Sequence, residues 1–233
     1  MPSASEPGLK SAWVDTHHQP GDTGTRPDPN GRLQLERPLF VCARLCLEII
    51  AGCCRVTAAW ASKGLATADP WDVELNVFHD LLKTRNQNRL FKLIASGHVI
   101  FAWWAPPCVL FSFARKFDGR GPRPLRDHEN PDVIPSWVTS PADLQALEDS
   151  NTLATVTARG MRLGHGRGVI NVVENPDRSS GWNFSPTEHA LLDIGAESIA
   201  TDFCAGPLDG ETGSHAPWRK RTRLAGTLPG LRR

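Results

Sequence analysis

Three short apolar runs, each followed by a turn signal, most constrain what this chain can fold into. Residues 45–50 (LCLEII), 99–104 (VIFAWW) and 169–173 (VINVV) contain at most one strongly polar side chain each. Runs this short and apolar are typical of strands that are buried on both faces of a sheet. The segments between them carry apolar residues at helical spacing, so strands and helices alternate. The sequence therefore predicts an α/β domain with a mostly parallel sheet and an antiparallel strand at its end.

The remaining elements follow from local signals for helix starts, helix ends and turns. The longest predicted helix has Ser140 as its N-cap and Pro141 at its first position. Predicted helices span residues 55–63, 81–95, 141–162 and 185–192, and further strands span residues 65–68, 198–204 and 221–225, the last two paired.

Composition limits the kind of chain this is. Residues 1–38 hold six Pro and four Gly among mixed charges, so we expect a disordered tail followed by one domain over residues 39–233. No apolar run reaches the length of a membrane span, and the N-terminus does not resemble a signal peptide. The six Cys form no Cys-x-x-Cys pair. We therefore expect an intracellular chain with no metal site, no disulfide framework and no membrane partner.

Two places at strand ends suit a nucleotide-like cofactor. Glu48 ends an apolar strand that runs into a turn at Gly52 and then a helix, and such a turn lets backbone amides approach a ligand. Asp72 follows 24 residues after Glu48, a spacing at which an acid can bind ribose hydroxyls. Strand–glycine–helix turns also occur in most α/β proteins without a ligand, so this pair alone is not specific.

Two further places could supply a nucleophile and a proton donor. Cys108 directly follows the Pro106-Pro107 corner, and the loop over residues 115–126 then carries five basic residues against one acid. That charge favours a thiolate and can receive phosphates. Glu174 ends the third apolar strand, where loss of solvent raises the pKa of a carboxyl and lets it donate a proton. A buried Cys and a strand-end Glu can equally be structural.

The order of these motifs resembles the cytosine-5 DNA methyltransferases over residues 45–226, most specifically in Pro107-Cys108-x-x-Phe111-Ser112 and Glu174-Asn175. The resemblance implies a Rossmann-like S-adenosylmethionine-dependent methyltransferase fold. It implies that Cys108 adds to carbon 6 of a flipped cytosine while Glu174 protonates or hydrogen-bonds nitrogen 3. Arg221 and Arg223 would support the base from a Gln-x-Arg-x-Arg-like element. The implied cofactor pocket comprises Glu48, Ile50, Ala51, Gly52, Asp72 at the ribose, Asp80 at the adenine, and Pro106.

The chain also departs from that family's pattern. Ile50 stands where an aromatic residue is usual, Cys54 where a second Gly is usual, Arg219 in place of Gln and Pro176 in place of Val. About 40 residues separate Glu174 from the basic element, which leaves little room for a target-recognition domain, and the closing helix of the cofactor pocket is missing.

Three functions follow from these motifs. The first is a methyltransferase acting on DNA, or on RNA, with nucleic acid held by the loop over residues 115–126 and by the C-terminal basic segment. The second is an inactive methyltransferase-like module that binds nucleic acid or protein. The third is a thiol hydrolase with His98 or His128 as its base. The first predicts that Cys108 and Glu174 face each other across a gap about one base wide.

Overall fold

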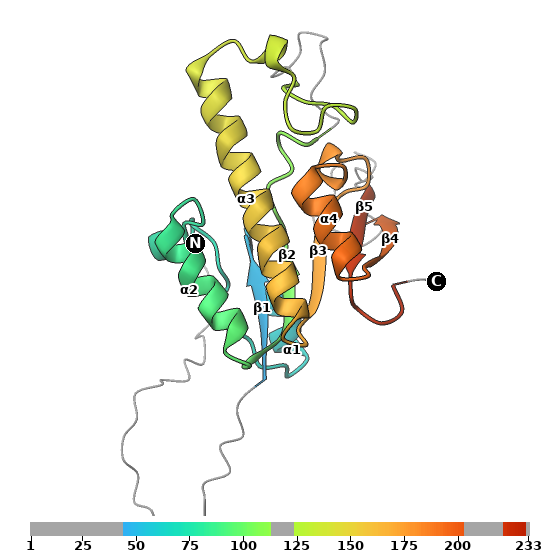
Figure 1. Ribbon diagram of the computed structural model, residues 1–233. Coiled ribbons are helices and arrows are strands. Elements are labelled where there is room, and N and C mark those ends of the chain that lie inside the picture. The colour runs from blue at the N-terminus through green and yellow to red at the C-terminus, as the bar shows by residue number, and fades with distance from the viewer. Residues whose placement is uncertain (1–43, 113–123, 203–220, 232–233) are drawn as a thin grey trace, which may run out of the picture. The chain divides into compact units, whose positions relative to one another are not determined.

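A five-stranded sheet forms the centre of the domain in the computed structural model, which describes residues 44–112, 124–202 and 221–231 (Figure 1). The predicted tail over residues 1–38 lies outside the described residues. The strand order is β1-β2-β3-β5-β4. The strands are β1 (Leu45–Ile49), β2 (Val99–Trp104), β3 (Ile170–Pro176), β4 (Glu197–Asp202) and β5 (Arg221–Gly226).

The strand directions confirm an α/β domain with a mixed, mostly parallel sheet. β1 pairs with β2 and β2 with β3, both in parallel, so the three apolar runs lie side by side as predicted. The prediction of an antiparallel strand at the end of the sheet is wrong. β5 runs antiparallel between β3 and β4, so the end strand β4 has the same direction as β1, β2 and β3.

The place of β5 was mispredicted because β3 is longer than its apolar run. Glu174, Asn175 and Pro176 continue the strand and pair with Leu224, Arg223 and Thr222 of β5. Backbone groups in the middle of a sheet need partners on both sides. β5 supplies them to β3 on one side and to β4 on the other, which a pattern of side chains alone does not reveal.

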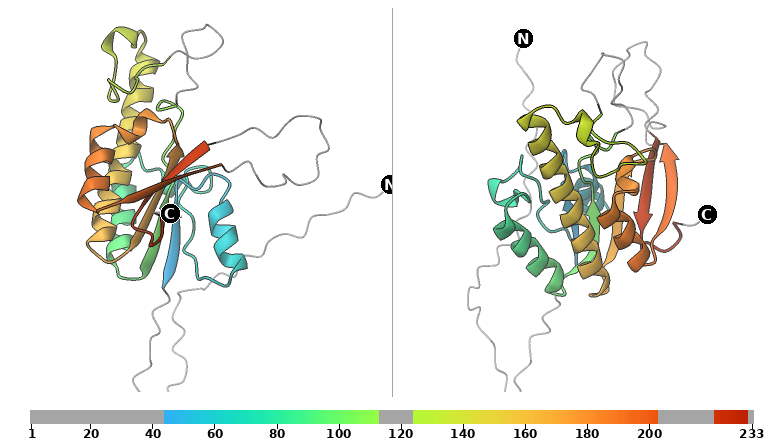
Figure 2. Two further views of the ribbon diagram at one scale, coloured as in Figure 1. Left: turned by 90° about the vertical axis from the view of Figure 1, so that its right-hand side faces the viewer. Right: turned by 45° about the horizontal axis from the view of Figure 1, so that its top comes forward.

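Helices cover both faces of the sheet. The helices are α1 (Arg55–Ser62), α2 (Thr84–Ala95), α3 (Pro141–His165) and α4 (Ser185–Asp193), with single turns η1 (Val77–His79), η2 (Pro135–Trp137) and η3 (Ser180–Trp182). α1 lies on one face, and α2, α3 and α4 lie on the other (Figure 2). The N-cap of α3 is confirmed, because the Ser140 hydroxyl accepts a hydrogen bond of 3.1 Å from the backbone N–H of Asp143.

Residues 65–68 do not form the predicted strand. Only isolated bridges join this segment and its continuation to β1, at Cys46 with Thr67 and at Ile49 with Trp71. Asp69 and Pro70 lie between the two bridges, and proline lacks the N–H that a ladder needs. The segment still runs parallel to β1, so it lies along the sheet without extending it as a full strand.

The core lies between the sheet and the three-helix face. The ring of Trp104 is fully buried against Gly160 of α3, and its Nε1 donates a hydrogen bond of 3.1 Å to Oδ1 of Asn171. On the other face, α1 has no fully buried residue and contacts the sheet through Trp60, whose ring lies edge-on to Phe101. No helix among the described residues is long and apolar enough to span a membrane.

Candidate active site

The predicted site residues gather at one edge of the sheet because β1, β2 and β3 end there together. Ile49 is paired with Trp104, and Trp104 with Val173. After β1 the chain first runs along the outer side of that strand and then returns to β2 on its other side. Ligands of open α/β sheets bind at the carboxyl ends of strands where the connections diverge in this way.

The turn after β1 is held by the segment around Asp72. Gly52 donates its backbone N–H to Oδ2 of Asp72 at 2.9 Å, and Oδ1 of Asp72 accepts from the N–H of Glu74 at 2.9 Å. The Trp71 carbonyl accepts from the N–H of Ile50 at 2.6 Å. Asp72 is buried, whereas Gly52 is exposed. The acid predicted to bind ribose therefore also fixes the shape of the turn.

Glu48 lies beneath the same turn. It is buried, and its Oε2 accepts from the backbone N–H of Thr57 at 2.6 Å and from the Thr57 hydroxyl at 2.5 Å. A carboxylate held at the N-terminal end of a helix is stabilised by the helix dipole and by free N–H groups. Glu48 thus joins β1 to α1, and Thr57, which no motif singled out, is its partner.

The turn has an unusual backbone. Ile50 has φ = 60°, Gly52 has φ = 51° and Cys54 has φ = 55°. The left-handed region favours glycine, so Ile50 and Cys54 are strained positions. The Cys54 thiol lies 3.7 Å from the Gly52 carbonyl oxygen, back over the turn. Burial raises the pKa of the Cys54 thiol, and the nearby carboxylates of Glu48 and Asp72 raise that pKa further.

Asp80 lies on the segment that follows Asp72. Its Oδ1 accepts from the backbone N–H of Leu82 at 2.9 Å, and its Oδ2 lies 3.9 Å from Nζ of Lys83. The rings of Trp71 and His79 stack with centroids 4.4 Å apart, and each ring belongs to the residue directly before one of the two acids. This stack keeps the two predicted cofactor contacts on one folded segment.

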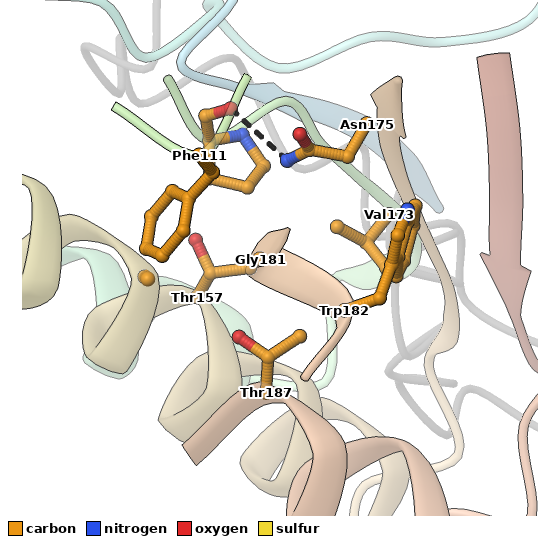
Figure 3. A pocket seen from close by; sticks show the side chains of 9 residues that line it. Phe111, Thr157, Val173, Asn175, Gly181, Trp182 and Thr187 are labelled. Carbon is orange, nitrogen blue, oxygen red and sulfur yellow. Dashed lines mark hydrogen bonds between the residues drawn. The ribbon is translucent and has the colours of Figure 1, made fainter. Parts of the chain in front are cut away.

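The loop that carries Cys108 is joined to β3 and to the turn after it. The side-chain amide of Asn175 donates to the Pro106 carbonyl at 3.5 Å (Figure 3). The Ser180 N–H donates to the Phe111 carbonyl at 2.9 Å. Cys108 itself is half-buried and is a free thiol. Asn175 stood only beside Glu174 in the sequence motif, and the structure gives it this contact to the Cys108 loop.

Arg126 was predicted to contact nucleic acid with the rest of its loop, and this is wrong. The residue is 3% exposed, with its guanidinium carbon 4.0 Å from the centroid of the Phe111 ring. Its Nη1 donates to the Pro131 carbonyl at 3.0 Å and to Oδ1 of Asn151 at 2.9 Å. Arg126 therefore supports the Cys108 loop from inside. Residues 113–123 lie outside the described residues.

Glu174 lies on the opposite face of β3 from its neighbours. Val173 and Asn175 line a cavity toward α3, where Thr157 also lines it (Figure 3). Successive side chains of a strand point to opposite faces of the sheet. The side chain of the half-buried Glu174 therefore lies on the face that carries α1, as that of Glu48 does. Cys108 thus follows β2, and Glu174 lies near the end of the adjacent parallel strand β3. Their facing across one base stays a prediction.

Arg221 and Arg223 converge on Asp177. The Nε atoms of Arg221 and Arg223 lie 3.1 Å and 3.0 Å from the two carboxylate oxygens of Asp177. The Arg223 guanidinium also lies 5.3 Å from the Trp182 ring centroid. Arg223 is paired with Asn175, so it shares the face of Asn175 and not that of Glu174. Sequence reasoning missed Asp177, although its position two residues after Asn175 was a usable signal.

The cavity beside Asn175 is small. Its volume is about 10 Å³, enough for about one water molecule. It is therefore too small for a nucleobase or a nucleoside. Its lining residues are Pro106, Phe111, Ala154, Thr157, Val173, Asn175, Gly181, Trp182 and Thr187.

His98 is not placed to act on Cys108. Its carbonyl bonds to the N–H of Leu45 at the start of β1, and the six-residue strand β2 lies between it and the Cys108 loop. A strand of that length spans roughly 20 Å. The exposed His128 accepts a hydrogen bond at its backbone carbonyl from Asn183.

Groups of three or more His, Cys, Asp and Glu placed to hold a metal ion are absent from the part of the chain that the structure describes. No protein-family model, no curated protein and no solved structure matches this chain.

Proposed function

We propose that this protein transfers a methyl group from S-adenosylmethionine to carbon 5 of cytosine in DNA, through a covalent bond to Cys108. The observation that carries the proposal is the register of β1, β2 and β3. It brings the Gly52 turn, the Cys108 loop and Glu174 to one edge of the sheet, although they are far apart in the sequence. Cofactor, nucleophile and acid must meet at one base for this chemistry.

The residues around Gly52 fit the cofactor. A Cβ atom built on Gly52 would have no atom within 4 Å, so the space directly around Gly52 is open. Asp72 offers a buried carboxylate beside it, whose oxygens keep further acceptor positions for ribose hydroxyls. We assign the cofactor to this turn, with Ile50, Ala51 and Pro106 around it and Asp80 at the adenine. The cofactor supplies an activated methyl group bound to a sulfonium.

The chain's own residues then carry out addition and elimination. The Cys108 thiolate forms a bond to carbon 6 of the cytosine while Glu174 donates a proton to nitrogen 3, so no negative charge is left on the ring. Carbon 5 becomes nucleophilic and takes the methyl group. Water takes the proton from carbon 5, the electrons of that C–H bond expel the thiolate, and the nitrogen 3 proton returns to Glu174. Asn175 and Arg126 hold the Cys108 loop in place from the interior.

A second candidate is a binding module without transfer activity. Cys54 favours it, because a side chain on left-handed backbone lies over the turn where the cofactor would sit. Asp177 favours it too, because its carboxylate forms ion pairs with both Arg221 and Arg223, the residues expected to support the base. A titration with S-adenosylmethionine separates the two candidates, since only the methyltransferase requires the cofactor to bind.

The direct test is transfer of labelled methyl groups to DNA. We expect Cys108→Ser to abolish transfer and to leave cofactor affinity unchanged, because the thiol takes part only in the chemical step. Glu174→Gln should slow transfer by about 100-fold or more, the range for a positioned acid. The control is Cys53→Ser, an exposed cysteine that should not matter. Full transfer by the Cys108→Ser variant, or no transfer by the unmodified protein, would exclude the proposal.

A further inference from the structure

The outer surface of η1 and α2 combines exposed cations with an exposed aromatic ring. We propose that this surface binds single-stranded nucleic acid, with phosphates on its cations and a base stacked on the ring. It comprises Phe78, Arg85, Arg89, Lys92 and Arg159, and we refer to it as the α2 surface. The proposal does not depend on methyl transfer at Cys108.

The charge of the α2 surface is of one sign. α2 contains no acidic residue, and Arg85, Arg89 and Lys92 are exposed at positions that share one face of the helix. They extend over about 10 Å of its length. None of the three forms an ion pair with a carboxylate of the described residues. Cations left without acidic partners attract the phosphate backbone of a nucleic acid.

Arg159 extends the positive charge from α2 to α3. It is exposed, and its guanidinium carbon lies 5.1 Å from the ring centroid of Phe91 on α2. α3 packs between α2 and α4, so α2 lies at one side of this three-helix face (Figure 1). The surface therefore spans two elements, which gives a strand of nucleic acid more than one line of contacts.

The aromatic ring of the surface is Phe78 in η1. Its side chain is 60% exposed, and the preceding Val77 is 72% exposed. The Arg89 guanidinium carbon lies 5.9 Å from the Phe78 ring centroid, so cation and ring are neighbours. Oδ1 of Asn76 accepts from the backbone N–H of Phe78 at 2.9 Å and holds the turn. An exposed aromatic beside arginine, on a fixed turn, suits stacking of a base.

The Phe78 ring favours single-stranded nucleic acid over other polyanions. Bases of a duplex are stacked on one another and present no face to Phe78, whereas bases of a single strand are free to stack. An acidic protein would satisfy the cations but would not use the ring. The aromatic contact therefore distinguishes a single-stranded nucleic acid from a duplex and from an acidic partner.

The test is fluorescence anisotropy with a labelled oligothymidylate about 12 nucleotides long, against a duplex of equal length and polyglutamate. Phe78→Ala should weaken oligothymidylate binding about tenfold, since one stacked base is lost. Arg85→Gln with Lys92→Gln should reduce the slope of log affinity against log salt by about 1.4, the value for two phosphates of a single strand. Circular dichroism confirms that each variant is folded.

Matched controls lie elsewhere on the domain. Leu192→Ala removes an apolar side chain that is 70% exposed on α4, and Arg55→Gln with Lys63→Gln removes one exposed arginine and one exposed lysine at α1, on the opposite face of the sheet. These variants should bind oligothymidylate as the unmodified protein does.

The outcomes separate this proposal from its competitors. Unchanged oligothymidylate binding by both α2-surface variants would overturn it. So would a duplex or polyglutamate that binds more tightly, is weakened by Arg85→Gln with Lys92→Gln and is insensitive to Phe78→Ala. The Cys108→Ser variant should retain oligothymidylate binding. Loss of methyl transfer and loss of oligothymidylate binding at the α2 surface are therefore measured independently.

Discussion

Gly52 donates its backbone N–H to the buried carboxylate of Asp72 over 2.9 Å, and the same carboxylate accepts from the N–H of Glu74. Asp72→Asn leaves one acceptor oxygen for two backbone donors, with an NH2 group facing the other donor. We expect the free energy of unfolding to fall by about 1–3 kcal/mol, measured by urea denaturation. Cofactor affinity, measured by calorimetry, should fall at least tenfold. The exposed Asp69→Asn is the control, and equal stability of both variants would contradict this role.

Cys54 occupies left-handed backbone that glycine adopts without strain. Cys54→Gly removes that strain, about 1 kcal/mol for a residue with a Cβ, and also removes the thiol that lies over the turn. We expect a higher melting temperature and tighter binding of S-adenosylmethionine. Cys53→Gly at the adjacent exposed position should give neither gain. A lower melting temperature of Cys54→Gly would show that the thiol stabilises the turn.

Gly160 lies against the buried ring of Trp104, where a Cβ would overlap the ring atoms. Gly160→Ala must displace Trp104, whose Nε1 bonds to Asn171, and overpacking of this kind costs about 1–3 kcal/mol. Chemical denaturation of Gly160→Ala should show that loss. Gly166→Ala is the matched change, because its Cβ would meet only ordinary contacts at 3.6 Å. If both alanine variants were equally stable, the packing of α3 on β2 would be different from that described.

The environment of His79 predicts that the free energy of unfolding depends on pH. Burial lowers the pKa of the His79 imidazole, and the Arg89 charge lowers it further, whereas Asp69, Asp72 and a backbone hydrogen bond at Pro70 act in the opposite direction. The unfolded chain therefore binds a proton at a pH where the folded protein does not. The free energy of unfolding should fall as pH decreases below the unfolded pKa of about 6.5, until the folded pKa is passed.

His79→Gln should remove this contribution. The difference in free energy of unfolding between the unmodified protein and the variant should shrink from about pH 8 to about pH 5. His165→Gln, at an exposed histidine of α3, should follow the unmodified protein across that range. Parallel curves for His79→Gln and the unmodified protein would contradict the prediction.

Local signals predicted most of the fold. The three apolar runs became β1, β2 and β3, and Ser140-Pro141 began the longest helix, because burial and capping are properties of short segments. The place of β5 between β3 and β4 was not predictable in this way. It depends on which strand edges remain unpaired after the other strands have formed, and the spacing of apolar residues in the sequence does not contain that information.

The candidate site was predictable in its location but not in its contacts. Parallel strands end at one edge, so the Cys108 loop and Glu174 were expected there, and β2 and β3 are adjacent. Arg126 belonged to a run of basic residues and was expected at the surface. Only the tertiary structure shows that it is buried over Phe111, because a charge pattern does not reveal which cation has partners inside.

The most direct measurement of the central claim is the mass of a covalent adduct with DNA that contains 5-fluorocytosine. Fluorine at carbon 5 cannot leave as a proton does, so the bond between Cys108 and carbon 6 persists after methyl transfer. The account predicts a complex that requires S-adenosylmethionine, maps to Cys108 and is absent from the Cys108→Ser variant. An adduct on another residue, or no adduct with cofactor present, would contradict it.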